Sequence, residues 1–272
     1  MNYLNPLIKD LNQFGEDRQK EYLNAEPFPN IVIDDFFNED ILSKVTDDFP
    51  DLSKKKDIIV YDNPNEKKLA AKGEGSFSET TKSFAHYLNS QPFLEFLQKL
   101  TGIKETLIPD PHFNGGGYHE IKPGGLLKVH SDFNKHEFTL LDRRLNLLVY
   151  LNKDWDESYG GHFELWDKEM KNAVKKILPV FNRIAIFSTT DFSNHGHPNA
   201  LTCPPGRSRK SLALYYYSNG RPKSEVNRPH ATIFKDRANM KGETIKEPVT
   251  FKDIVHDIVP PILLRTIKKI IR

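Results

Sequence analysis

The sequence predicts a mainly β protein with flanking helices, in which the strands form an antiparallel sandwich, barrel or jelly roll. From about residue 106 onward, short strand-like runs follow one another, separated by turns such as Gly160-Gly161 and Pro204-Pro205-Gly206. Many short strands with Gly and Pro turns between them are typical of antiparallel β folds. The expected strands cover residues 118–121, 126–132, 145–151, 162–166, 183–188 and 210–218.

The N-terminal part is expected to combine helices with one strand. A short amphipathic helix followed by a charged linker is predicted within residues 1–25, with Leu4, Leu7, Ile8, Leu11 and Phe14 on its apolar side. Residues 27–36 have the composition of a strand, and Asn38 is a suitable N-cap for a helix that runs to Phe49. Two further helices are expected near residues 79–89 and 92–101.

The segment 51–80 has no clear periodicity and is rich in Lys and Gly. A long irregular segment within a compact domain is either a lid or binding loop, or a disordered insertion. The sequence leaves both interpretations open.

Composition sets limits on the class of protein. The chain has 272 residues, 38% of them hydrophobic and 28% charged, and a formal net charge of +2, which gives no electrostatic case for binding nucleic acid. The single cysteine, Cys203, excludes an intrachain disulfide and fits either a reducing cytoplasm or a protein that is indifferent to redox conditions. Residues 1–22 lack the apolar core of a signal peptide, and no apolar stretch is long enough to span a bilayer. We therefore expect a cytoplasmic protein.

The C-terminal residues 250–271 have apolar residues at mostly helical spacing, interrupted by Pro260-Pro261, with Arg265, Lys268 and Lys269 among the polar positions. A basic amphipathic helix of this kind binds a membrane surface or a partner, or docks on its own domain, which is the commoner outcome. We expect three regions: an N-terminal helix and linker (1–25), a central domain (26–222) and a C-terminal extension (223–272).

A possible metal site begins with His130-Ser131-Asp132 in the strand expected at residues 126–132. Residues i and i+2 of a strand point to the same face, so the imidazole and the carboxylate can reach one point in space. With a second His they would form the 2-His-1-carboxylate triad of non-haem Fe(II) oxygenases. The pair alone is weak evidence, because His162-Phe163-Glu164 has the same spacing.

The remaining parts of such a site occur later in the chain. A strand that ends near Ser188 runs into a loop that contains His195 and His197. Arg209 and Ser211 then stand at i and i+2 at the start of an apolar strand and are expected to share a face. An inward guanidinium is costly without an anionic partner, and a ligand carboxylate matches its planar fork.

The order of these motifs resembles the Fe(II)/2-oxoglutarate-dependent dioxygenases of the prolyl 4-hydroxylase-like group. The resemblance covers residues 27–220 and includes the expected entry strand at 27–36. It also includes the run from Arg144 to Asn152, then Trp155, Gly160-Gly161 and Leu165-Trp166-Asp167. It implies a double-stranded β-helix, or jelly-roll, core.

Carried over to these positions, the resemblance implies that His130, Asp132 and His195 bind Fe(II). His195 is preferred over His197 because it has the first position of His-Gly-x-Pro. Arg209 would bind the distal carboxylate of 2-oxoglutarate, with Ser211 as a possible helper. His162 is interpreted as structural or as a neighbour of the ligands, and Arg207 as a solvated neighbour of Arg209.

One feature departs from the family pattern. Members often have a Tyr in a Tyr-x-Pro-Gly-like turn shortly before His-x-Asp, whereas this turn reads Ile121-Lys122-Pro123-Gly124. Tyr118 and Lys128 are candidates for the second contact to 2-oxoglutarate, and a core role for Tyr118 is an equal alternative.

The resemblance implies that 2-oxoglutarate and O2 are consumed and that an unactivated C–H bond is hydroxylated, with ascorbate as a possible further cofactor. A prolyl residue of a peptide or protein is the first expectation for the substrate. The alternatives are a small metabolite, a free amino acid or a sugar, or a non-catalytic metal-binding jelly-roll module. No nucleic-acid partner is expected, and a homodimer is possible.

Overall fold

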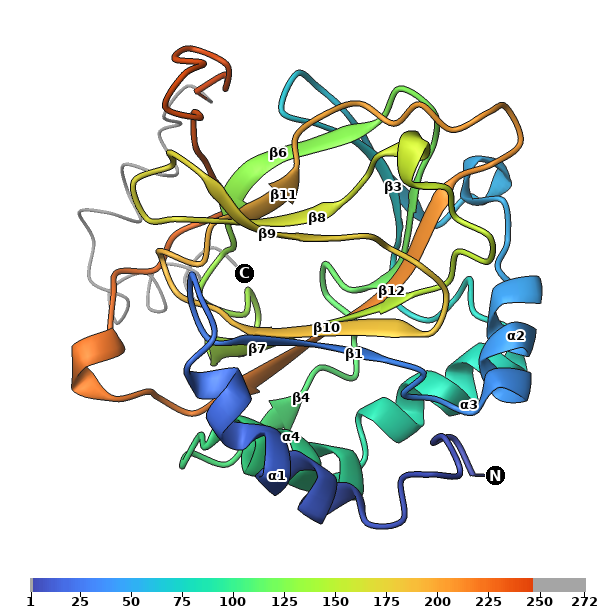
Figure 1. Cartoon of the computed structure of the whole chain (residues 1–272), viewed down its shortest axis with the longest axis vertical. Helices are drawn as coiled ribbons and strands as arrows, with labels where there is room; N and C mark the ends of the chain where they lie inside the picture. Colours follow the sequence, from blue (N-terminus) through green and yellow to red (C-terminus); the bar gives the residue numbers. More distant parts are fainter. Residues whose placement is uncertain (1, 247–272) are drawn as a thin grey trace, which may run out of the picture.

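A computed structural model describes residues 2–246, which form a mostly antiparallel sheet with four α-helices (Figure 1). The helices are α1 (Leu11–Leu23), α2 (Glu39–Asp47), α3 (Glu79–Leu88) and α4 (Gln91–Thr101). The strands are β1 (Asn30–Asp34), β2 (Ile58–Asp62), β3 (Glu66–Ala71), β4 (Ile108–Pro109), β5 (Gly117–Ile121), β6 (Leu126–Ser131), β7 (Asp142–Tyr150), β8 (Phe163–Trp166), β9 (Ala173–Ile177), β10 (Arg183–Ser188), β11 (His195–His197), β12 (Arg209–Ser218) and β13 (Ile233–Phe234).

The sheet curls into a nearly closed, barrel-like sandwich. Its strand order is β1-β10-β7-β12-β5-β3-β6-β11-β8-β9, with β2, β4 and β13 joined to the side of this path. Figure 1 shows β6, β11, β8 and β9 facing β1, β10 and β7 across the interior. The jelly-roll prediction is confirmed.

The two faces of the central strands differ: one packs in the large core and the other lines the barrel interior. Along β7, Leu145, Leu147 and Val149 belong to the large core, while Asn146 and Leu148 between them line the barrel interior. This period of two is the normal consequence of strand geometry. The outward face of β7, β10 and β12 is therefore apolar, and their inward face is free to be polar.

The helices cover that outward face. In Figure 1, α1, α3 and α4 lie beneath β1, β10 and β7. Their aromatic side chains, among them Phe84, Phe93 and Phe96, are fully buried in the same cluster as the outward residues of the sheet. This packing makes the sheet a rigid support for whatever its inner face carries.

The N-terminal helix lies further along the chain than the sequence analysis expected. The residues before it form an isolated bridge, in which Leu4 pairs with Phe37, and then a turn. The helix begins after Asp10, whose carboxylate accepts a hydrogen bond from the backbone N–H of Gln13. The stretch expected to be a charged linker is therefore helical. In contrast, α2 with its N-cap Asn38, α3 and α4 lie where they were predicted.

The segment 51–80 is neither an irregular lid nor a disordered insertion. It contains the hairpin β2–β3, and β3 is paired with both β5 and β6 inside the sheet. Its side chains are mostly half-buried, so the alternation that identifies a strand in a sequence is weak here.

The described part of the C-terminal extension adds a short strand beside β6. Its strand β13 pairs Ile233 with Ser131 and Phe234 with His130. The amphipathic helix expected over 250–271 lies outside the described residues. Within residues 2–246, no helix is both long enough and apolar enough to span a membrane.

Candidate metal centre

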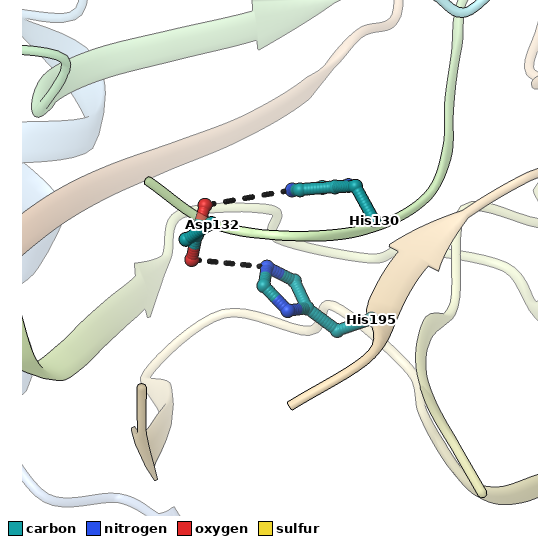
Figure 2. A group of neighbouring side chains, drawn as sticks. All are labelled: His130, Asp132 and His195. Atoms are coloured by element: carbon teal, nitrogen blue, oxygen red, sulfur yellow. Dashed lines mark ion pairs between the residues drawn. The ribbon is translucent and has the colours of Figure 1, made fainter. Parts of the chain in front are cut away.

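Two adjacent strands bring two histidines and one aspartate together. His130 on β6 and His195 on β11 are direct partners in an antiparallel ladder, and Asp132 follows the end of β6. Figure 2 shows both imidazoles turned toward the same carboxylate. Nε2 of His130 lies 3.6 Å from Oδ1 of Asp132, and Nε2 of His195 lies 3.4 Å from Oδ2.

These three side chains have the donor set and spacing of a metal site. One donor atom from each lies within 4.8 Å of the others, and all three residues are buried. Metal bonds of about 2.1 Å place ligands at right-angled positions about 3 Å apart. The separations of 3.6 and 3.4 Å from the carboxylate oxygens exceed that value by about 0.5 Å, so a small divalent ion would draw the three side chains slightly closer together.

The backbone fixes the orientation of both imidazoles. Nδ1 of His130 is 2.8 Å from the carbonyl oxygen of Lys128, and Nδ1 of His195 is 2.8 Å from that of Ser193. Because a carbonyl only accepts hydrogen bonds, each Nδ1 carries the proton and each Nε2 keeps a free lone pair. Burial also lowers the pKa of His195 to about 4 against the opposing effect of Asp132, so this imidazole is neutral at neutral pH.

Asp132 is held ionised and in place by two neighbours. Asn146 donates a hydrogen bond of 2.7 Å to Oδ2, and Nη2 of Arg143 lies 3.3 Å from the same oxygen. Burial alone would raise the pKa of Asp132, but the charge of Arg143 and the imidazoles of His195 and His130 outweigh it and hold this pKa well below its ordinary value.

The triad opens into a pocket of about 80 Å³ inside the barrel. This is room for several water-sized groups, and so for a small ligand beside a metal ion. Lys68, His119, Asn146, His197, Arg209, Ser211 and Tyr215 contribute polar atoms to the wall. The predicted common face of Arg209 and Ser211 is thus the face that lines this pocket.

Arg209 is the strongest anion-binding group in the wall. Its side chain is buried, Nε donates a 2.8 Å hydrogen bond to the carbonyl of Gly161, and Nη2 lies 3.5 Å from the hydroxyl of Tyr150. Within residues 2–246 it forms no ion pair with a carboxylate. A buried guanidinium without a counter-ion is costly unless a ligand supplies the negative charge.

Tyr150 was not singled out in the sequence. Burial raises its pKa to about 12, so the hydroxyl keeps its proton and can donate a hydrogen bond beside Arg209. The alternation of β7 could have found it, because Asn146, Leu148 and Tyr150 stand at i, i+2 and i+4.

The two candidates for a second ligand contact lie elsewhere. The Tyr118 hydroxyl donates a 2.6 Å hydrogen bond to Oγ1 of Thr81, and its ring is fully buried between aromatic side chains, outside the pocket. This is the core position that the sequence left open. The Lys128 ammonium donates to the carbonyl of Glu243 in the C-terminal extension and does not line the pocket.

His162 and Arg207 are also outside the metal centre. Nε2 of His162 lies 3.8 Å from Oε1 of Glu157, beside a hollow in the outer surface. Nη2 of Arg207 donates to the carbonyls of residues 153 and 154. His197 lines the pocket but is not among the three donors, and burial together with the charge of Arg209 holds its pKa well below the ordinary value.

Fold and site together define a jelly-roll protein with a 2-His-1-carboxylate metal centre, a set of ligands characteristic of non-haem Fe(II) oxygenases. The model of the 2OG-Fe(II) oxygenase superfamily matches residues 116–217, which include the triad and Arg209. This central part of the chain therefore matches the 2OG-Fe(II) oxygenase superfamily, whose cofactors and co-substrates are Fe(II), 2-oxoglutarate and O2.

Two curated relatives match parts of the chain. The chain is 24% identical over 215 residues to the prolyl 3-hydroxylase OGFOD1 of Xenopus laevis, a match that covers 76% of this chain and 39% of that protein. A match to OGFOD1 of Mus musculus covers 15% of that protein, so the chain spans less than half the length of these curated relatives.

Two solved structures share the fold. A prolyl 4-hydroxylase of Pseudomonas putida is 15% identical with a TM-score of 0.55, covering 77% of this chain and all of that one. A prolyl hydroxylase of Trichoplax adhaerens, solved with a hypoxia inducible factor peptide, is 18% identical with a TM-score of 0.55, covering 76% of this chain and 90% of that one.

Proposed function

We propose that this chain hydroxylates a prolyl residue of a peptide or protein, with Fe(II) held by His130, Asp132 and His195. Arg209 would anchor the distal carboxylate of 2-oxoglutarate. The observation that carries this proposal is the position of Arg209: this buried charge has no carboxylate partner among residues 2–246 and lines the same small pocket as the triad. A metal centre alone would need no such group.

The protein side of the reaction follows from these contacts. Arg209 presents a planar fork that matches a carboxylate, and the hydroxyls of Ser211 and Tyr150 lie on the same inward face of the barrel. The neutral His195 and the ionised Asp132 are in the protonation states that metal binding requires. When bound, Fe(II), 2-oxoglutarate and O2 supply the oxidising chemistry, in which 2-oxoglutarate is decarboxylated to succinate and one oxygen atom enters a C–H bond.

The small size of the pocket is consistent with a peptide substrate that binds at its mouth and leaves most of its chain outside. A cavity of about 80 Å³ has room for a small ligand but not for a peptide. A peptidyl proline would therefore present only its ring to the metal centre, with the rest of the chain outside. The prolyl hydroxylases among the relatives support this choice over a free amino acid, a sugar or another small metabolite.

The compartment is proposed from the sequence. A single cysteine, buried at position 203, suits a reducing cytoplasm. We expect the basic segment 250–271 to dock on its own domain and not on a membrane.

Anaerobic binding and turnover test the proposal. Fe(II) with 2-oxoglutarate should give a weak visible charge-transfer band, and Asp132→Ala should abolish metal binding. Arg209→Ala should keep the metal and raise the 2-oxoglutarate requirement at least about 30-fold, because it removes a buried charge-assisted contact. Arg207→Ala is the matched control, since Arg207 lies two residues away but contacts only backbone carbonyls of a neighbouring turn.

A screen of succinate release identifies the substrate class. Peptidyl proline should stimulate release and gain the mass of one oxygen atom, whereas free amino acids and sugars should not. Stimulation by a sugar or a free amino acid alone would replace the prolyl assignment. Absence of both the band and succinate release with all substrates would leave a non-catalytic metal-binding module.

A further inference from the structure

His197 is a buried polar side chain that the proposed function does not yet use. It lies on β11 two residues after His195, is 3% exposed and lines the pocket together with Arg209. Both of its ring nitrogens are buried, and neither has a hydrogen-bond partner in the described part of the chain, residues 2–246. Such groups are rare in folded proteins, because each costs the free energy of lost hydration.

The backbone fixes His197 in this position. The ladder between β11 and β6 shifts register after His195, so that His197 pairs with Leu127. Gly196 makes this approach possible: a Cβ there would lie 2.7 Å from the carbonyl oxygen of Leu127 and 2.9 Å from that of Lys128. The close pairing with β6 therefore fixes the backbone that carries the imidazole.

Neither metal binding nor core packing explains why an imidazole stands at this position. The group of possible metal donors contains His130, Asp132 and His195, and His197 is not part of it. Packing would be served equally well by a leucine, which carries no polar atoms to desolvate. The two free nitrogens therefore indicate a partner that enters the pocket from outside the protein.

The neighbouring charges define that partner as an anion. Arg209 has only N–H donors to offer, and Lys68 brings a second cation to the wall, although Nζ of Lys68 is 3.0 Å from a carboxylate oxygen of Glu66. A neutral imidazole carries one N–H in either tautomer. A carboxylate between Arg209 and His197 can accept from both, since each of its oxygens has two lone pairs.

We propose that His197 donates a hydrogen bond to the distal carboxylate of 2-oxoglutarate, and that with Arg209 it selects a diacid over a 2-oxo acid with an apolar tail. This inference rests on the proposed function, because it assumes that 2-oxoglutarate occupies the pocket. It adds a specificity-determining residue on β11, two residues after the proposed metal ligand His195.

Binding to the full chain loaded with Mn(II) under anaerobic conditions tests the assignment without turnover. The two probes are 2-oxoglutarate and 2-oxopentanoate, which has the same chelating end but a methyl group in place of the distal carboxylate. Calorimetry gives the affinity, and the relaxation of water protons reports displacement of water from Mn(II). The variants are His197→Leu, which removes the donor, and His197→Gln, which keeps one.

We expect His197→Leu to weaken 2-oxoglutarate binding about 10- to 100-fold and to change 2-oxopentanoate binding less than about threefold. His197→Gln should retain most of the affinity for 2-oxoglutarate. The inference is overturned if the leucine variant binds 2-oxoglutarate like the wild type, if it loses both acids or Mn(II) equally, or if the glutamine variant loses as much as the leucine variant. If the wild-type protein does not bind 2-oxoglutarate, the proposed function itself is wrong. This result differs from normal wild-type binding with an unaffected leucine variant, which would contradict only the role of His197.

Discussion

Nη2 of Arg143 lies 3.3 Å from Oδ2 of Asp132, and the guanidinium is held between two aromatic rings. Its Cζ atom is 4.2 Å from the ring centroid of Phe133 and 3.5 Å from that of Tyr215. With 1% of its surface exposed, Arg143 is a fully buried cation next to the proposed metal ligand. It neutralises Asp132 when no metal ion is present, and the rings keep it from leaving.

Arg143→Gln should destabilise the metal-free protein by about 3–5 kcal/mol, because it leaves the buried Asp132 without its partner. The loss should be smaller with saturating Mn(II), since the metal ion takes over part of the charge neutralisation. Urea unfolding in chelator and in Mn(II) measures both values. Arg144→Gln is the control: Arg144 is paired with Glu105, away from the triad, and its loss should be the same in both conditions. Equal losses for Arg143→Gln in the two conditions would contradict this role.

Phe234 connects the C-terminal extension to the metal centre. Its ring centroid lies 5.6 Å from that of His130, on a strand that pairs with β6 at this residue. Phe234→Ala should weaken metal binding about tenfold by loosening the His130 ring, a size typical of outer contacts to metal ligands. Competition with a chromogenic chelator measures it. Ile233→Ala, on the same strand but 42% exposed, should have little effect, and an equal effect of both would assign the loss to the strand and not to the ring.

The metal centre could be predicted from the sequence because local geometry determines it. His130 and Asp132 share a face by strand period, as do Arg209 and Ser211, and the Gly-containing loop offers a histidine next to them. The partners of these residues could not be predicted in the same way. The alternation of β7 indicates the inward face for Asn146, but it does not indicate that Arg143 and Asn146 reach Asp132 from a different strand.

In the fold too, elements determined by local sequence could be predicted, whereas strands stabilised by pairing with distant parts of the chain could not. Strands with strong alternation and helices with clear N-caps lie close to their predicted positions. The hairpin β2–β3 and the strand β13 were missed, because their stability comes from backbone pairing with β5 and β6. Such pairing depends on where the partner strand lies in space, which the composition of the segment does not encode.

The backbone of Gly161 lies directly against the side chain of Arg209. Its backbone has φ +71°, and a Cβ there would lie 2.6 Å from Cδ2 of Leu201 and 3.0 Å from Cδ of Arg209. Gly161→Ala should therefore displace the guanidinium and weaken 2-oxoglutarate binding about tenfold or more, with a loss of about 1–2 kcal/mol in stability from backbone strain. Gly206→Ala is the control, because Gly206 has φ +87° with open space around it. The Gly206→Ala variant should lose stability but keep its affinity for 2-oxoglutarate. A similar loss of affinity in both variants would mean that backbone strain, and not displacement of Arg209, weakens 2-oxoglutarate binding.

His119 should make the metal-free protein sensitive to acid. Burial lowers the pKa of His119 from 6.5 to about 3, with a contribution from the charge of Lys68. Between these pH values the unfolded chain binds a proton at His119 that the folded protein does not. The free energy of unfolding therefore falls as the pH is lowered through this window, by up to about 1.4 kcal/mol per pH unit for this one group. Above 6.5 both states are neutral and the group contributes no slope.

His119→Gln removes the pH-dependent contribution of His119 to the free energy of unfolding and leaves those of the other histidines unchanged. Relative to the wild type, the variant should gain about 1–2 kcal/mol of stability between about pH 7 and pH 5, measured by urea unfolding in chelator. Above about pH 7 the difference between the two proteins should not change with pH, which serves as the internal control. A difference that stays constant from pH 7 to pH 5 would mean that His119 takes up its proton equally easily in the folded and the unfolded chain, and that its place in the pocket wall does not exclude the charged form.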